Sequence, residues 1–205
     1  MKEPVKSRDR IVQQAQQMFF TQGYSKILMT ELARQLGMSK KTLYQHFKSK
    51  EELLCVVIRE YNAEIQEMAA GIMKEEMLSY PEKISKIFTL AGIRMLEISP
   101  SFVEDVKRNA PVAWELMQKL KAESAFLRFS VLLDEGVRDG CIRNDINQPL
   151  TVLLYACALE KMFDPDFVRQ IPEELLQELP DSPAAVFEGI TKVLFNGILD
   201  KPHTI

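Results

Sequence analysis

The sequence is poor in the residues on which many protein chemistries depend. Among its 205 residues there are only three cysteines and two histidines. The number of cysteines is odd, and they are widely spaced, at Cys55, Cys141 and Cys157. This argues against a disulfide framework and against the usual zinc spacings. His46 and His203 stand far apart in the sequence. We therefore expect no metal site and no cofactor.

Long apolar runs are also missing. No stretch approaches the roughly 18 apolar residues of a membrane-spanning helix, and residues 1–10 lack the apolar centre of a signal peptide. There is no glycine-rich phosphate loop, and no nucleophile lies at a recognisable spacing from a base. The sequence thus predicts a cytoplasmic protein that has no membrane partner and is not an enzyme.

What the chain does have is helical periodicity. Apolar residues recur at spacings of three and four, and no alternation of period two is long enough to predict a sheet. We therefore expect an all-α fold. Helices are predicted over residues 7–22, 40–46, 49–79, 82–98, 102–108, 111–138, 150–163, 173–179 and 184–199, with a further short helix ending at Gly37.

The charge is distributed unevenly. Residues 1–52 hold ten Lys and Arg against five Asp and Glu, a net +5, whereas the remainder holds sixteen against twenty-four, a net −8. A basic module on an acidic body places any contact with a polyanion at the N-terminus. The sequence predicts two domains, residues 1–52 and residues 53–205.

Residues 29–54, MTELARQLGMSKKTLYQHFKSKEELL, are rich in local structural signals. Gly37 favours the left-handed conformation that ends a helix, and Ser39 is a good N-cap for the next one. Ser49 and Glu52 have the spacing of a capping box. Two short helices joined by a glycine-containing turn predict a helix-turn-helix.

This order of residues resembles the tetracycline-repressor-like (TetR) transcriptional regulators. The resemblance covers about the first quarter of the chain and implies a homodimer that binds double-stranded operator DNA. The sequence departs from the family at Ile27 and Leu28, where Thr or Ser usually caps the second helix. The residues that carry the resemblance are Gly23, Tyr24, Leu32, Ala33, Gly37, Met38, Ser39, Lys40, Thr42, Leu43, Tyr44, His46, Phe47 and Lys50 to Leu54.

Cations, hydroxyls and an aromatic ring occupy the outward side of the second helix of the motif. Such groups suit phosphates and base edges in the major groove, although a solvated helix face has the same composition. In the family, the residues matching Tyr44 and Lys50 contact phosphate, and Lys50 also lies at a helix N-terminus that favours an anion. Lys40, Lys41 and Thr42 are the predicted base readers. The predicted DNA-binding residues are Ser39, Lys40, Lys41, Thr42, Tyr44, His46, Lys50 and Thr30.

The rest of the chain agrees with the family only in length and helical character. In the family these helices enclose a cavity for a small-molecule effector, and two helices of each subunit form the dimer. The apolar helix over residues 150–163 and the helix over residues 184–199 fit that interface. Methionine and aromatic side chains adapt well to apolar ligands. The predicted pocket residues are Phe88, Arg94 as an anchor for an anionic group, Met95, Trp114 and Phe126.

The sequence thus predicts a homodimeric, ligand-responsive repressor that binds a palindromic operator, because two recognition helices read more base pairs than one. Two other functions stay open. The chain could be a helical protein-interaction module whose helix-turn-helix does not bind DNA. It could also be a thiol-based redox sensor that uses Cys141.

Overall fold

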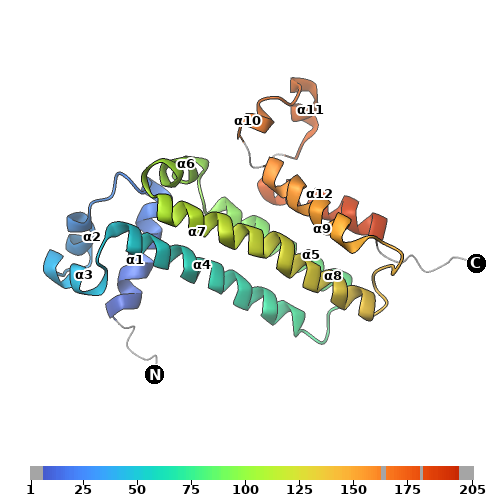
Figure 1. Ribbon diagram of the computed structural model, residues 1–205, viewed down its shortest axis with the longest axis horizontal. Coiled ribbons are helices and arrows are strands. Elements are labelled where there is room, and N and C mark those ends of the chain that lie inside the picture. Colours follow the sequence, from blue (N-terminus) through green and yellow to red (C-terminus); the bar gives the residue numbers. More distant parts are fainter. Residues whose placement is uncertain (1–6, 163–164, 181, 199–205) are drawn as a thin grey trace, which may run out of the picture. The chain divides into compact units, whose positions relative to one another are not determined.

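The computed structural model describes residues 7–162, 165–180 and 182–198, and this part of the chain contains helices but no β-strand (Figure 1). The predicted all-α class is confirmed. None of the described helices is long and apolar enough to cross a membrane. The helices are α1 (Ser7–Gln22), α2 (Met29–Gln35), α3 (Lys40–His46), α4 (Lys50–Met73), α5 (Tyr80–Leu96), α6 (Pro100–Asn109), α7 (Pro111–Ala122), the π-helix η1 (Glu123–Arg128), α8 (Phe129–Arg138), α9 (Gln148–Met162), α10 (Pro165–Val168), α11 (Glu173–Glu178) and α12 (Pro183–Ile198).

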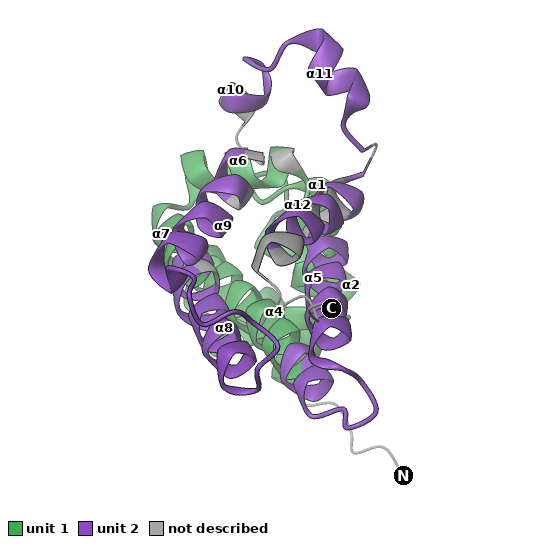
Figure 2. Ribbon diagram, turned by 90° about the vertical axis from the view of Figure 1, so that its right-hand side faces the viewer, with its two compact units in different colours: residues 1–67, 97–120 green, residues 68–96, 121–205 purple. Residues whose placement is uncertain are grey.

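The chain divides into two compact units (Figure 2). The first unit consists of residues 1–67 and 97–120, and the second of residues 68–96 and 121–205. The first unit therefore holds the helix-turn-helix together with α6 and most of α7. A division of the chain into domains at residue 52 stays a prediction.

The core of the first unit joins α1, α2 and α3 to α4 and α6. Phe19, Leu32 and Leu43, one from each of the first three helices, are fully buried. Phe20 packs edge-on against Phe102 of α6, with ring centroids 5.2 Å apart. The first three helices thus share one small core, and α6 extends it.

The core of the second unit is built around aromatic rings from three helices. Phe88 of α5, Phe129 of α8 and Tyr155 of α9 pack with ring centroids 4.1 to 6.0 Å apart. At the end of α8, Gly136 lies so close to Tyr80 that an added Cβ would come within 2.6 Å of its ring. Only glycine allows this approach of helix to ring.

Apart from shifts of one or two residues at helix ends, two predicted helices differ from those observed. The helix predicted to reach residue 79 ends at Met73. The backbone N–H and hydroxyl of Ser79 donate hydrogen bonds to the Glu82 carboxylate, and these bonds hold the start of α5, whose first residue is Tyr80. The helix predicted over residues 111–138 is interrupted by η1. Residues 112–135 contain no proline or glycine, so nothing in that stretch predicts the change of helix type.

Candidate DNA-binding surface

The turn between α2 and α3 has the geometry that its residues predict. Gly37 has a φ of 67°, in the left-handed region that glycine adopts without strain. The Ser39 hydroxyl oxygen accepts a hydrogen bond from the Thr42 backbone N–H, 3.0 Å away. This cap satisfies a first-turn donor of α3 and fixes where the helix begins.

Two buried residues set the orientation of α3. Leu43 and Phe47 are almost completely buried, so the opposite side of the helix faces outward. Thr42 is half-buried, and its hydroxyl lies 2.8 Å from that of Ser39. The exposed residues of α3 are Lys40, Lys41, Tyr44, Gln45 and His46.

Gln45 belongs to this exposed face but is not among the DNA-binding residues predicted from the sequence. It has no charge, and it is not one of the residues that carry the family resemblance. An exposed amide on such a helix can pair with adenine through two hydrogen bonds. Its place between Tyr44 and His46 is the signal that would have found it.

The entry to α2 differs from the entry to α3. Leu28 occupies the N-cap position of α2 and provides no side-chain hydrogen bond. Ile27 is buried, whereas Leu28 is 62% exposed. Thr30 is exposed in the first turn of α2. The departure from the family pattern at Ile27 and Leu28 therefore leaves α2 without a side-chain cap.

The side chains of Ser49 and Glu52 both accept backbone hydrogen bonds at the start of α4. The Ser49 hydroxyl oxygen accepts a hydrogen bond from the Glu52 N–H at 3.0 Å. The Glu52 carboxylate accepts from the Lys48 N–H at 2.6 Å, one residue before the position that the capping box predicts. The pair fixes the first turn of α4, which carries Lys50.

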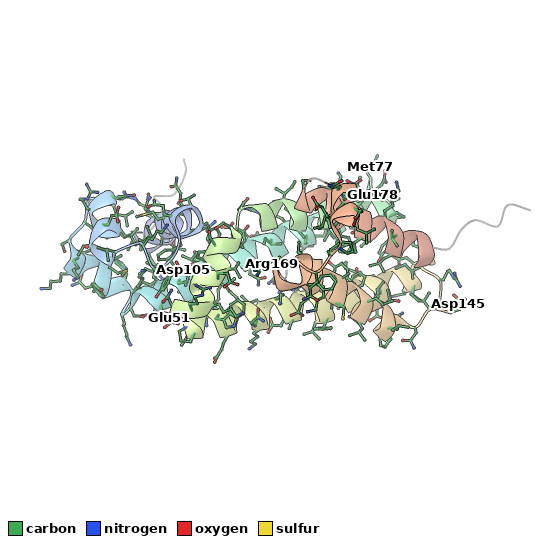
Figure 3. The ribbon with its side chains drawn as sticks, turned by 90° about the horizontal axis from the view of Figure 1, so that it is seen from above. Glu51, Met77, Asp105, Asp145, Arg169 and Glu178 are labelled. Carbon is green, nitrogen blue, oxygen red and sulfur yellow. The ribbon has the colours of Figure 1, made fainter. Side chains whose placement is uncertain are left out.

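Lys50 is half-buried and held by its neighbours. Its ammonium group lies 3.4 Å from the carbonyl oxygen of Ser25 and 4.2 Å from the centroid of the Tyr24 ring. Burial lowers the pKa of Lys50, while the Asp105 carboxylate acts to raise it. Asp105 is labelled in Figure 3 and belongs to the same compact unit. Neither Ser25 nor Asp105 is among the site residues predicted from the sequence.

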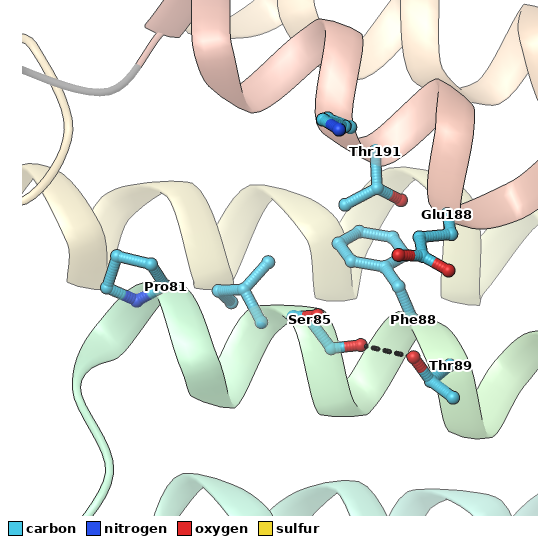
Figure 4. A pocket seen from close by; sticks show the side chains of 8 residues that line it. Pro81, Ser85, Phe88, Thr89, Glu188 and Thr191 are labelled. Atoms are coloured by element: carbon cyan, nitrogen blue, oxygen red, sulfur yellow. Dashed lines mark hydrogen bonds between the residues drawn. The ribbon is translucent and has the colours of Figure 1, made fainter.

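The predicted pocket residues do not all line one hollow. Phe88 lies in a hollow of about 230 Å³ between α5 and α12, together with Ile84, Glu188 and Thr191 (Figure 4). Phe88 is thus the predicted pocket residue that lines this space.

The other predicted pocket residues have different surroundings. Arg94 donates to the Met68 sulfur at 3.4 Å. Phe126 is exposed, and Trp114 belongs to the first unit. The side chain of Met95 lies outside the described part of the chain.

Metal-binding chemistry was not expected from the sequence. Among the residues that the structure describes, no group of three or more His, Cys, Asp or Glu side chains is placed to hold a metal ion. The exposed groups described above are instead donors and cations, which suit an anionic partner.

A helix-turn-helix whose second helix exposes cations is typical of DNA-binding transcriptional regulators. Residues 11–56 match the family model described as "Bacterial regulatory proteins, tetR family". The repressor AcnR of Corynebacterium diphtheriae is 31% identical over 151 residues, which cover 71% of this chain and 72% of that protein. The chain belongs to the TetR family of transcriptional regulators.

Two further comparisons extend over nearly the whole chain. The uncharacterised HTH-type transcriptional regulator YvaF of Bacillus subtilis is 29% identical over 190 residues, 92% of this chain and 94% of that protein. A transcriptional regulator from Saccharomonospora viridis, solved in complex with choline, has a TM-score of 0.69 at 15% identity and covers 97% of this chain and 100% of that one. The likeness to this second protein is one of fold.

Proposed function

We propose that this regulator is a ligand-responsive repressor that binds a palindromic operator as a homodimer in the cytoplasm. The observation that carries the DNA contact is the face of α3. Leu43 and Phe47 are buried on one side of this capped helix, and Lys40, Lys41 and Tyr44 are exposed on the other. A rigid helix that presents cations can enter a major groove without first becoming ordered.

The exposed residues divide into two proposed roles. Lys40, Lys41 and Gln45 read base edges. Thr42 also reads a base edge when its hydroxyl is not hydrogen-bonded to that of Ser39. Phosphate contacts position the protein on the duplex. The proposed phosphate contacts are Tyr44, Lys50, His46, Ser39 and Thr30.

The dimer is proposed to form through α9 and α12. Leu150, Leu153, Leu154 and Cys157 are exposed on α9 at positions i, i+3, i+4 and i+7, which is the spacing of one helix face. On α12, Val193 is exposed. Apolar residues exposed in such a stripe mark an interaction surface. A twofold dimer presents two recognition helices to a palindrome.

The effector site is proposed to be the hollow between α5 and α12. Phe88 and Ile84 supply apolar surface there, and Glu188 and Thr191 supply polar groups. A hollow that combines apolar surface with polar groups is typical of small-molecule sites. The regulator from Saccharomonospora viridis, which shares the fold, was solved with the small molecule choline. An effector acts by binding more tightly to the state that does not fit the operator.

The test is binding to an operator selected from a random duplex library. Wild-type affinity should fall steeply with salt, because each phosphate contact releases counterions. The double variant Tyr44→Phe, Lys50→Ala should bind all sequences more weakly and with a shallower salt dependence. Equal binding by this variant and the wild type at matched salt would show that the face is not a DNA contact.

Two further measurements of DNA binding test the two alternatives. A protein-interaction module is not retained on duplex DNA at about 100 mM salt. A redox sensor shows an altered DNA affinity after peroxide treatment, and the Cys141→Ser variant loses that response. Unchanged affinity after peroxide counts against the sensor.

A further inference from the structure

The turn between α1 and α2 is held by a side chain eighty residues away in the sequence. The carboxylate oxygen Oδ2 of Asp105, in α6, accepts hydrogen bonds from the backbone N–H of Ser25 at 2.8 Å and from its hydroxyl at 2.9 Å. Within the turn, Tyr24 and Ile27 are buried, but Leu28 does not cap α2. α6 therefore supplies the side-chain acceptor that holds the Ser25 backbone N–H.

Asp105 is fixed in this position. Its other oxygen, Oδ1, accepts a hydrogen bond from the Asn109 side chain at 2.7 Å. Gly23 has a φ of 94°, and a Cβ added there would lie 3.2 Å from Oδ2. Burial raises the pKa of Asp105, but the hydrogen bonds from Ser25 and Asn109 and the charge of Lys50 outweigh it and hold the pKa below its usual value. The carboxylate is thus charged and oriented at neutral pH.

The same turn holds the ammonium group of Lys50. The Ser25 carbonyl accepts from Lys50, while the N–H and hydroxyl of Ser25 donate to Asp105, so that Ser25 links the two charged groups. The Tyr24 ring lies beneath the ammonium group. Lysine has a flexible four-carbon side chain with many rotamers, so the ammonium group has a defined position only where neighbouring groups hold it.

We propose that Asp105 is a positioning residue for DNA binding. Through Ser25 it keeps the α1–α2 turn and the Lys50 ammonium group where a backbone phosphate of the operator is bound. Asp105 touches no DNA in this arrangement. The inference rests on the proposed function, in which Lys50 is a phosphate contact. A negative charge near a phosphate is repulsive, so an aspartate that strengthens binding must act through the groups it orders.

The charge argument provides a matched control. Glu104 precedes Asp105 on α6 and makes an exposed pair with Arg108 at 3.3 Å. Glu104→Ala and Asp105→Ala remove the same charge from adjacent positions. Glu104→Ala should leave duplex affinity unchanged or slightly increased. Asp105→Ala should reduce it about fivefold, the order of magnitude for leaving one long side chain unordered before binding.

A double-mutant cycle with Lys50→Ala distinguishes positioning from a general loss of stability. If Asp105 acts through Lys50, then Asp105→Ala has little further effect in the Lys50→Ala background, and the salt dependence of the two single variants is reduced alike. If Asp105→Ala only lowers the stability of the fold, it weakens DNA binding equally in the wild-type and Lys50→Ala backgrounds. Asp105→Asn retains an acceptor for Ser25, should give a smaller loss, and serves where the alanine variant fails to fold.

The outcomes separate the two proposals. If Lys50→Ala weakens binding but Asp105→Ala and Asp105→Asn bind as tightly as Glu104→Ala, the role of Asp105 is wrong and the DNA-binding proposal stands. The inference also fails if the losses from Asp105→Ala and Lys50→Ala add in full. If the wild type shows no salt-dependent binding to duplex DNA, the proposed function fails first.

Discussion

Glu51 and Val112 are 61 residues apart in the sequence and are joined by a hydrogen bond of 2.8 Å from the Val112 N–H to the Glu51 carboxylate. The same carboxylate oxygen accepts a longer bond from the Ala113 N–H, at 3.3 Å. A residue in the first turn of α4 therefore caps the start of α7. This contact lies inside the first compact unit and ties the helix-turn-helix to a helix far along the chain.

Removing this cap should lower stability. Glu51→Ala leaves two first-turn N–H groups of α7 without their acceptor and removes a negative charge from a helix N-terminus. We expect a loss of about 1 kcal/mol in the free energy of unfolding, and a smaller loss for Glu51→Gln, which keeps an acceptor. Urea denaturation at fixed protein concentration measures both. Glu67→Ala, an exposed change in the same helix α4, should stay within about 0.5 kcal/mol of the wild type.

The close contact between Gly136 and Tyr80 leads to a second prediction. Gly136→Ala would bring a Cβ within 2.6 Å of the Tyr80 ring and of Ile142, so the core must shift. Overpacking of this kind costs about 1–3 kcal/mol. Gly71, in α4, has nothing within 4 Å of an added Cβ. Gly71→Ala should stabilise the protein by up to about 1 kcal/mol through helix propensity. Thermal unfolding of both variants should therefore give opposite shifts, and equal shifts would contradict the packing argument.

The local parts of the fold were predictable from the sequence, and the long-range parts were not. The turn at Gly37 and the caps at Ser39 and Ser49 depend on residues within four positions, and each was predicted from its neighbours. The hydrogen bonds from Ser25 to Asp105 and from Val112 to Glu51 cross 80 and 61 residues. No periodicity or spacing encodes such a pair, because tertiary packing brings the partners together.

The candidate site shows the same division. The exposed face of α3 follows from two buried residues, Leu43 and Phe47, whose spacing of four is visible in the sequence. The surroundings of Lys50 depend on Asp105, and those of Phe88 on α12. Each of these neighbours comes from another part of the chain. The sequence therefore indicates Lys50 and Phe88 but not the groups that surround them.

A third prediction concerns base recognition by α3. Lys41→Ala should weaken binding to the selected operator by about 1–3 kcal/mol and binding to random duplex by much less, because a base contact carries sequence information. Gln45→Ala should relax specificity without changing the salt dependence, since no charge is lost. Competition between operator and random duplex measures both. Lys74→Ala removes one exposed charge from the second unit and should alter neither quantity. An equal loss on operator and random duplex would assign Lys41 to a phosphate instead.

A fourth prediction concerns the apolar stripe on α9. Leu153 and Leu154 are about half exposed, and a charge placed there would have to be buried in the proposed dimer. Leu153→Glu with Leu154→Glu should therefore yield monomers in sedimentation, while Met77→Glu, at a position 93% exposed, should sediment like the wild type.

The same pair of changes should affect a neighbouring thiol. Cys157 lies on the stripe with Leu153 and Leu154 and is exposed in the single chain, so the dimer would cover it. Labelling of Cys157 by a thiol reagent should be slow in the wild type and fast in the glutamate variant, whereas Cys55, whose pKa burial raises, should react slowly in both. A glutamate variant that still sediments as a dimer and keeps Cys157 protected would place the interface on another face. Loss of the dimer should also abolish binding to the full palindrome, because one recognition helix contacts only one half-site.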